Sequence, residues 1–461
     1  MSWVDIFIAM LPEELLLGGI VVLVVLSIAA PPGAQGGFRV SLLFVTLATA
    51  AAAWLAANGF EFAAFPGQYS VNAVTLTAKA IVLALAVPVL LISREDFAQC
   101  QFHILLLSSL YGVCLLLSAD SFLVLFLGIE LMSLPVYALV LLAFRRPESA
   151  EAALKYLVLG GTATATLLMG VSLLYGSSGS LELSVFAAAL TSPNAMTSVA
   201  VVLVVAAFFL KAAIVPFHAW APDAYEAAAV PVTAYMATIV KAGVLLAAVR
   251  LFGNAPLLGP MADLLAILPL VSIVWGNLAA MRQHSFRRMI AYSSIAHAGY
   301  LYYAFLGDGP GRFQAVAFYV LVYGLMNLLA FAALPRDPDD AARDRLDNLK
   351  GLFHRNPFAA LMIGAAMLSL AGIPPFPGFI AKFLIFKNVI AAGFTLYAVL
   401  GLVGSYLGIY FYLRVIQLLF MSEEASAVQG APGRFALGAS FICLLAAILA
   451  AVFPGWVMEL L

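Results

Sequence analysis

Five ionisable side chains stand inside long apolar stretches of this sequence: Lys79, Glu130, Lys211, Lys241 and Lys382. An ionisable group at the centre of a lipid bilayer costs about 2.5–3.5 kcal/mol. Left unpaired in lipid, the five would cost on the order of 10–15 kcal/mol, which is comparable with the stability of a whole domain. We therefore expect them to face a hydrated interior and one another. The alternatives are a structural ion pair, or a lysine that extends its charge to the membrane surface.

Buried lysines near a carboxylate are suited to proton transfer. Burial strongly lowers the pKa of a lysine, whereas a nearby carboxylate raises it, so a lysine whose partner moves away can release its proton near neutral pH. Arginine could not do this, because its guanidinium stays charged. His218 and His297 could extend such a relay, since imidazole titrates near physiological pH, although a lone histidine is as often structural.

The remainder of the chain has the composition of a membrane protein. Of its 461 residues, 64% are hydrophobic and only 10% are charged, against roughly 25% charged in a soluble domain. Apolar runs of about 20 residues, the length of a membrane span, recur from end to end without the alternation of a β-barrel. We predict an all-α polytopic membrane protein with about fourteen transmembrane helices, near residues 15–31, 40–57, 72–92, 103–119, 121–143, 154–175, 196–216, 232–252, 261–281, 290–306, 313–334, 358–386, 396–420 and 434–453.

Two predicted spans are interrupted by proline and carry a lysine beside the interruption. In FFLKAAIVPFHAWAPDAYEAA, Lys211 precedes Pro216 by five residues, and in SLAGIPPFPGFIAKFLIFKNV, Lys382 follows Pro377 by five. The two lie an odd number of spans apart and so run in opposite directions. Paired broken helices in inverted halves mark the functional centre of many transporters, although membrane helices often contain proline.

The chain is accordingly predicted to form a single membrane domain, residues 1–461, with two inverted five-helix repeats that each contain a Pro-broken helix. The expected units are three N-terminal helices (about 1–102), the first repeat (about 103–252), the second repeat (about 261–420) and a C-terminal helix (about 434–453).

Basic residues gather in the connections after the odd-numbered spans. The positive-inside rule places those connections in the cytoplasm, which puts both termini on the periplasmic side. The longest connection, RDPDDAARDRLDNLKGLFHRNP, is then cytoplasmic, as a short amphipathic helix or a loop. The basic residues concerned are Arg39, Arg94, Arg145, Arg146, Arg282, Arg287, Arg288, Arg336, Arg343, Arg345, Lys350, Arg355 and Arg434.

Charges close to span ends are given ordinary roles. Arg250 and Arg414 are expected to anchor or pair, and Lys155 is expected to form a cytoplasmic salt bridge with the nearby acidic residues. Asp223 and Glu226 follow the first proline break and either surround an outer-facing vestibule or face solvent.

Several kinds of site are absent from the sequence. The net charge of -1 argues against a nucleic-acid partner. There is no P-loop, no GxGxxG after a strand, no cysteine cluster for iron–sulfur ligation and no histidine pair placed for haem. Cys100, Cys114 and Cys443 are far apart and are expected to be small apolar fillers. We expect no redox cofactor, metal or nucleotide in this chain.

Four long motifs resemble the antiporter-like subunits of bacterial complex I and the related multisubunit cation/proton antiporters: FLGIELMSLPVYALV, LKAAIVPFHAWAPDAYEAAAVPVTAYMATIVKAGV, FRRMIAYSSIAHAGY and LSLAGIPPFPGFIAKF. Within that group, SSIAHAGY and GIELMSLPVYAL are most similar to the N-type subunits, the counterparts of mitochondrial subunit 2. The L-type ends in a long lateral helix for which this chain has no room. The M-type has a glutamate where Lys382 stands. One departure is EAAAVPV, where the family usually has a form like EGAPTPV.

The resemblance implies a role for each matching residue. It implies that Glu130 pairs with Lys211, that Lys241 connects the two halves, and that Lys382 exchanges protons with the far side. His218 matches a polar residue often found near the first break. His297 lies in SSIAHAGY and is a possible relay member from its chemistry alone.

The function expected from the resemblance is proton translocation as a subunit of NADH:quinone oxidoreductase in the bacterial inner membrane. NADH, FMN, iron–sulfur clusters and quinone would be bound by partner subunits, with an M-type subunit, small K- and J-type subunits and lipids as neighbours. The alternatives are a subunit of a sodium/proton antiporter and a membrane scaffold whose lysines only hold helices together.

Overall fold

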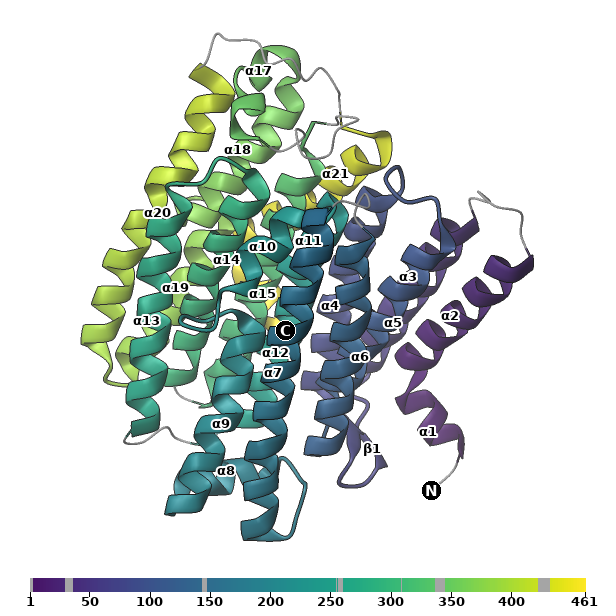
Figure 1. The fold of residues 1–461 in the computed structure, drawn as a ribbon, viewed down its shortest axis with the longest axis vertical. Helices are drawn as coiled ribbons and strands as arrows, with labels where there is room; N and C mark the ends of the chain where they lie inside the picture. Colours follow the sequence, from purple (N-terminus) through teal and green to yellow (C-terminus); the bar gives the residue numbers. More distant parts are fainter. Residues whose placement is uncertain are drawn as a thin grey trace.

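The apolar runs of the sequence are long helices in the structure, a computed structural model that describes residues 3–29, 36–142, 147–253, 255, 260–307, 309–335, 345–421 and 432–461 (Figure 1). The elements of the first half, in chain order, are α1 (Trp3–Ala9), α2 (Leu11–Ala29), α3 (Gly36–Ala57), β1 (Phe62–Phe65), β2 (Tyr69–Val71), α4 (Ala73–Ser93), α5 (Cys100–Leu117), α6 (Phe122–Leu141), α7 (Pro147–Ser178), α8 (Ser184–Thr191), α9 (Ala195–Ala212), α10 (Trp220–Ala227), α11 (Val230–Tyr235), the π-helical turn η1 (Met236–Val240) and α12 (Lys241–Phe252).

The second half is also helical. Its elements are α13 (Pro260–Ala280), α14 (Phe286–Tyr303), the 3-10 turn η2 (Ala304–Leu306), α15 (Gly309–Ala332), the 3-10 turn η3 (Leu346–Leu349), α17 (Leu352–Arg355), α18 (Pro357–Ala371), α19 (Pro377–Ala391), α20 (Thr395–Met421), α21 (Arg434–Val452) and α22 (Pro454–Leu460).

The number of long helices confirms the prediction of an all-α polytopic membrane protein. Within the described residues, 12 helical segments are long and apolar enough to cross a membrane. Helix α14 and the pair α18–α19 stand where the other two spans were predicted, so about fourteen is a fair count. Helix α14 begins four residues before the predicted start, because the Ser285 hydroxyl accepts a hydrogen bond from the Arg288 N–H and caps the helix.

Lipid-facing and core helices differ in their burial. On α6, four leucines that recur about once per turn are exposed: Leu123, Leu127, Leu131 and Leu134. Such an apolar stripe is suited to lipid. By contrast, the continuous segment α11–η1–α12 is buried along its whole length, and α15 is buried along nearly all of it. The centre of the protein is therefore the helix that carries Lys241.

Two of the helices are broken where the proline pattern predicts. Helix α9 ends at Ala212 and α10 begins at Trp220, whereas α18 ends at Ala371 and α19 begins at Pro377. In Figure 1, α10 lies above α9, while α19 lies below α18, so the two broken helices run in opposite directions. This is the arrangement expected of two spans that lie an odd number of spans apart.

The two ends of the bundle are built differently. Figure 1 shows the β1–β2 hairpin and α8 at the lower end and α17 at the upper end. In the hairpin, Phe62 pairs with Val71 in antiparallel register. The described part of the longest predicted cytoplasmic connection forms η3 and α17, two short helical turns. Four of the basic residues used for the orientation lie outside the described residues, namely Arg145, Arg146, Arg336 and Arg343.

Buried charge first appears far from the broken helices, between α2 and α4. Lys79 Nζ lies 2.6 Å from Glu13 Oε1, and both side chains are fully buried. The Tyr69 hydroxyl donates to the same carboxylate oxygen at 2.7 Å and accepts from Lys79 at 2.8 Å. Lys79 thus forms a close ion pair with a carboxylate that was not among the residues singled out from the sequence. The three cysteines are free and buried, as expected of apolar fillers.

Removing one partner of the Glu13–Lys79 pair should strongly destabilise the protein. Glu13→Leu leaves a buried ammonium uncompensated, a loss that typically costs about 3–5 kcal/mol. The triple variant Glu13→Leu/Tyr69→Phe/Lys79→Met removes the charges and the hydroxyl together and should recover most of that stability, because a well-packed apolar replacement is often neutral. Thermal unfolding of the purified proteins in detergent measures both effects. A triple variant no more stable than Glu13→Leu would contradict this account.

Candidate functional site

The structure brings Glu130 and Lys211 together. Lys211 Nζ lies 3.8 Å from Glu130 Oε1, too far for a hydrogen bond but within ion-pair distance. The ammonium also contacts the hydroxyls of Ser133 and Tyr137, at 3.3 and 3.4 Å. The carboxylate accepts a 2.5 Å hydrogen bond from the Thr164 hydroxyl. The two side chains therefore form an ion pair without a direct hydrogen bond, and each has at least one hydroxyl partner of its own.

The break after Lys211 is closed by side chains. Ala213 adopts a left-handed conformation with φ 62° and ends α9. This conformation is uncommon for a residue other than glycine. The Trp220 indole N–H donates to the Leu210 carbonyl at 2.9 Å, and the Val215 N–H donates to the Ser272 hydroxyl at 2.8 Å. These bonds satisfy backbone groups that a broken helix would otherwise leave buried and unpaired.

Lys241 stands at the start of α12, directly after η1. Its ammonium donates to the Ser294 carbonyl at 2.8 Å and also contacts the Ser294 hydroxyl. Its exposed fraction is 4%. Among the described residues, neither Lys241 nor Lys382 forms an ion pair. A π-helical turn inside a helix is frequent at functional sites, and here it immediately precedes an ammonium solvated only by neutral groups.

His297 lies between two tyrosines. Its Nδ1 is 2.8 Å from the Tyr319 hydroxyl, and its Nε2 is 3.1 Å from the Tyr412 hydroxyl. Tyr412 is in turn hydrogen bonded to the Ser293 hydroxyl at 2.5 Å. Ser293 directly precedes Ser294, the residue that accepts hydrogen bonds from Lys241. The polar groups around His297 therefore lie next in sequence to the partner of Lys241.

Lys382 fills the second break. Its ammonium donates to the Ala371 carbonyl at 3.0 Å and to the Ser405 hydroxyl at 2.9 Å, and it lies 4.9 Å from the centre of the Tyr300 ring. Gly372 has a φ of +83°, and a Cβ there would stand 2.9 Å from Lys382 Cδ. Only glycine therefore combines this backbone turn with space for the lysine stem. A small cavity between His297 and this break is lined by, among others, Tyr323, Ser369 and Gly378.

The space between Lys211 and Lys241 is different in character. No hydrogen bond in the described part of the chain links the groups around one lysine directly to those around the other. The small cavity next to Lys211 is lined mainly by apolar residues, including Phe208 and Val244, the latter one helical turn beyond Lys241. Hydroxyl and imidazole groups gather near Lys241 and Lys382, but no hydrogen bond among the described residues joins the His297 group directly to the partners of Lys382 either.

His218 stands apart from this line of residues. It accepts a hydrogen bond from the Trp275 indole N–H at 3.0 Å and is only partly buried. None of its described contacts involves Glu130, Lys211 or Lys241. His218 lies within the first break, between the end of α9 and the start of α10, but the structure does not bring this histidine together with the other candidates.

The residues that follow the first break gather with Lys155 at one end of the bundle. The Asp223 carboxylate lies 2.8 Å from Lys155 Nζ and 2.9 Å from the Arg288 guanidinium. The same guanidinium lies 2.9 Å from the Glu226 carboxylate. Lys155 pairs in addition with Glu151 at 2.8 Å. Asp223 and Glu226 are partly exposed in a charged cluster at the end that the positive-inside rule assigns to the cytoplasm, an arrangement closer to the expected solvent-facing role than to an outer-facing vestibule.

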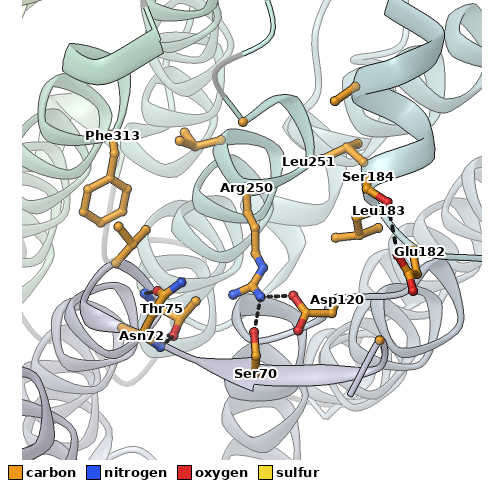
Figure 2. Close-up of a pocket in the computed structure, with 15 residues that line it drawn as sticks. Ser70, Asn72, Thr75, Asp120, Glu182, Leu183, Ser184, Arg250, Leu251 and Phe313 are labelled. Carbon is orange, nitrogen blue, oxygen red and sulfur yellow. Dashed lines mark hydrogen bonds and ion pairs between the residues drawn. The ribbon is translucent and has the colours of Figure 1, made fainter. Parts of the chain in front are cut away.

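A cavity lies at each end of the protein. The cavity at the Asp223 end has a volume of about 920 Å³ and is lined by charged residues from α7, α10 and α14. The cavity at the end of the β1–β2 hairpin has a volume of about 840 Å³. Figure 2 shows Arg250 reaching from α12 into this second cavity, where it contacts Asp120 and the Ser70 hydroxyl. Arg250 is thus paired, as predicted for a charge near a span end.

Arg414 and Arg312 also use backbone groups as partners. The Arg414 guanidinium donates to the carbonyls of Met281 and Gln283 at 3.0 and 3.3 Å, which fits the anchoring role predicted for it. Arg312 is buried and donates to the Gly253 carbonyl at 2.7 Å and to two further carbonyls near η2. These arginines stabilise helix ends and take no part in the line of lysines.

Sequence comparisons identify the family of this chain. Residues 119–408 match the family model described as NADH:quinone oxidoreductase/Mrp antiporter, transmembrane. NADH-quinone oxidoreductase subunit N of Pelobacter propionicus is 39% identical over 93% of this chain and 92% of its own length. The chain belongs to the subunit N family. The Laribacter hongkongensis member of this family is 34% identical over 94% of this chain and 91% of its own length, and the resemblance inferred from the four motifs is confirmed.

Solved structures agree with membership of the subunit N family. A chain in respiratory complex I from Thermus thermophilus with bound aureothin is 35% identical, with a TM-score of 0.85 over 97% of this chain and 98% of that chain. A chain in the Mrp complex from Dietzia sp. has a TM-score of 0.84 but only 21% identity, over 100% of this chain and 96% of that chain. That second likeness shows a shared fold alone.

Two adjacent glycines on α7 allow a test of the Lys211 surroundings. A Cβ on Gly160 would stand 1.9 Å from the Tyr137 hydroxyl, whereas a Cβ on Gly161 would meet nothing within 4 Å. Gly160→Ala should displace the Tyr137 hydroxyl from Lys211 and destabilise the protein by about 1–3 kcal/mol, as overpacking does.

Gly161→Ala is the matched control, because alanine is the better helix former by up to about 1 kcal/mol. Its melting temperature should equal or exceed that of the unmodified protein, while that of Gly160→Ala should fall. Equal melting temperatures for the two variants would show that Tyr137 does not need the space at Gly160.

Proposed function

We propose that this chain is a proton-translocating membrane subunit of respiratory NADH:quinone oxidoreductase, and that its own residues move protons but carry no electrons. The single observation that carries the relay is the setting of Lys241. Its ammonium is buried in the central helix, without an ion pair in the described residues, between the Glu130–Lys211 pair and the His297 and Lys382 surroundings. A group that must change its charge gains from neutral partners, because no buried counter-ion is left behind when it deprotonates.

The proposed cycle begins at the Glu130–Lys211 pair. A signal from quinone reduction in partner subunits changes the separation of this pair, and Lys241 responds by releasing or taking up a proton. The released proton moves through the hydroxyl and imidazole groups around His297 to Lys382, and from there to the outer side. Moving one charge against 100 mV requires about 2.3 kcal/mol, which corresponds to fewer than about two units of pKa difference, at roughly 1.4 kcal/mol each.

Partners and cofactors follow from the same proposal. NADH, FMN, iron–sulfur clusters and quinone would be bound by other subunits of the complex, with an M-type subunit and small K- and J-type subunits beside this chain. The complex would lie in the bacterial inner membrane with both termini of this chain in the periplasm. The two inverted repeats, residues 103–252 and 261–420, would be the two halves between which Lys241 passes the proton.

An antiporter subunit without electron transfer is the other function considered from the sequence. The relatives with more than 30% identity carry the name of the oxidoreductase, whereas the Mrp chain is similar at the level of fold. Co-purification of quinone-reductase subunits with this chain would support the first function, and co-purification of small antiporter subunits would support the second.

Replacement of Lys241 by methionine tests the relay directly. Methionine fills a similar volume without a titratable group, so NADH-driven proton pumping by the assembled complex should fall by roughly tenfold or more, the factor that corresponds to about 1.4 kcal/mol in a barrier. Lys241→Arg should also fail, because arginine keeps its proton. Pumping is measured in inverted membrane vesicles and normalised to the amount of assembled complex.

The matched control is Lys387→Met, at an exposed lysine of α19 away from the relay. It should pump at the wild-type rate. A scaffold role for the lysines makes the opposite prediction for Lys241→Met, namely normal turnover per complex with fewer complexes assembled. That outcome would rule out the relay.

A further inference from the structure

The short helix α10 contacts the surroundings of both Lys211 and Lys241, which share no direct hydrogen bond. At its first residue, the Trp220 indole is stacked on the Tyr156 ring, with ring centres 4.2 Å apart and planes 1° from parallel. Tyr156 meets the Tyr137 ring edge-on at 4.5 Å. Tyr137 is the hydroxyl partner of Lys211. A chain of three packed aromatic rings therefore links Lys211 to the start of α10.

Near its other end, α10 contacts Ser294, which accepts hydrogen bonds from the Lys241 ammonium. The Tyr225 hydroxyl lies 3.5 Å from the Ser294 hydroxyl, and that same hydroxyl is contacted by the Lys241 ammonium. Tyr225 is almost fully buried, so water does not compete strongly for its hydroxyl. When Tyr225 donates to Ser294, the serine oxygen has less electron density to offer an ammonium.

Three neighbouring elements hold the C-terminal end of α10. The Thr233 hydroxyl of α11 donates to the Tyr225 carbonyl at 2.7 Å, and the Ser149 hydroxyl of α7 donates to the Ala227 carbonyl at 2.9 Å. Arg287 of α14 donates to the Ala228 carbonyl at 2.5 Å. Helix α10 is thus hydrogen bonded to α7, α11 and α14 at this end.

We propose that α10 is the coupling element between the two lysines, with Trp220 and Tyr225 as positioning residues. When Lys211 moves relative to Glu130, the Tyr137, Tyr156 and Trp220 rings shift together and α10 shifts with them. Tyr225 then approaches or leaves Ser294, which changes how well Ser294 holds the Lys241 ammonium. No proton passes along the aromatic rings, which have no role as acids or bases in this step. This inference rests on the proposed function.

The test uses two substitutions that keep a buried ring. Tyr225→Phe removes the hydroxyl that contacts Ser294, and Trp220→Phe shortens the stack and removes the indole N–H. Each should lower NADH-driven pumping per assembled complex by roughly fivefold, the effect expected from losing one buried hydrogen bond. Each should also shift the pH at which pumping is half-maximal, because the solvation of Lys241 has changed. A merely structural role would reduce assembly and leave the pH profile per complex unaltered.

Tyr235→Phe is the matched control. Tyr235 is another fully buried tyrosine, on α11; its hydroxyl donates to the Ser109 hydroxyl at 2.7 Å, and among the described residues it forms no hydrogen bond with Lys211, Lys241 or Ser294. This variant should keep the wild-type rate and pH profile. The double variant Trp220→Phe/Tyr225→Phe should fall no further than the more affected single variant, because both residues act on one path.

The outcomes separate this inference from the proposed function. The coupling role of α10 would be overturned by any of three results. The first is a wild-type pH profile of pumping in both single variants, and the second is a loss of pumping in the double variant equal to the product of the two single losses. The third is a loss of pumping in Tyr235→Phe as large as in the single variants. If Trp220→Phe does not assemble, Tyr225→Phe alone decides. Lys241→Met is measured in the same vesicles: wild-type pumping there defeats the proposed function itself, whereas lost pumping with unaffected Tyr225→Phe and Trp220→Phe defeats only the coupling role.

Discussion

The need to keep ionisable groups solvated inside an apolar bundle shapes the rest of this protein. Lys241 shows the constraint most clearly, because its ammonium has only a hydroxyl and a carbonyl of Ser294 as described hydrogen-bond partners. Lys382 likewise depends on a carbonyl exposed by a helix break and on a serine hydroxyl. Broken helices and the hydroxyls of serine and tyrosine are the means by which the bundle supplies polar groups at depth. The architecture follows from where charge must be held.

The buried charges are solvated in two chemically different ways. Glu13 and Lys79 are in close contact and share a tyrosine, which suits a fixed ion pair. Glu130 and Lys211 are 3.8 Å apart and each has a separate hydroxyl partner. The first arrangement holds its charges in place, whereas the second tolerates separation. The two pairs have the same residue types but differ in geometry, which residue type alone does not reveal.

The fold and the lysines could be predicted from sequence because both signals are local. An apolar run of spanning length, or a lysine within one, is conspicuous without knowledge of any neighbour. The partners could not be predicted in this way. Ser294, Tyr137 and Trp220 are common residue types in membrane helices, and their importance arises only from what the folded chain places next to them.

Two further residues show where local reasoning ends. Glu13 lies in a flank that resembles an ordinary polar terminus, yet its partner is 66 positions away on α4. Asp223 was left with two expected settings because a proline break does not reveal whether the chain reverses or continues beyond it. Both cases concern direction and distance in space, which residue type and spacing within one segment do not specify.

The Glu13–Lys79 contact has a consequence for how this architecture can be inherited. Helix α2 supplies the only carboxylate that pairs with Lys79 in the described residues, while Lys79 belongs to the body of the bundle. A descendant that discarded its first three helices would retain a buried cation without a counter-ion. Loss of those helices and replacement of Lys79 by a neutral residue should therefore occur together in evolution, so that the residue at this position records whether the N-terminal helices are present.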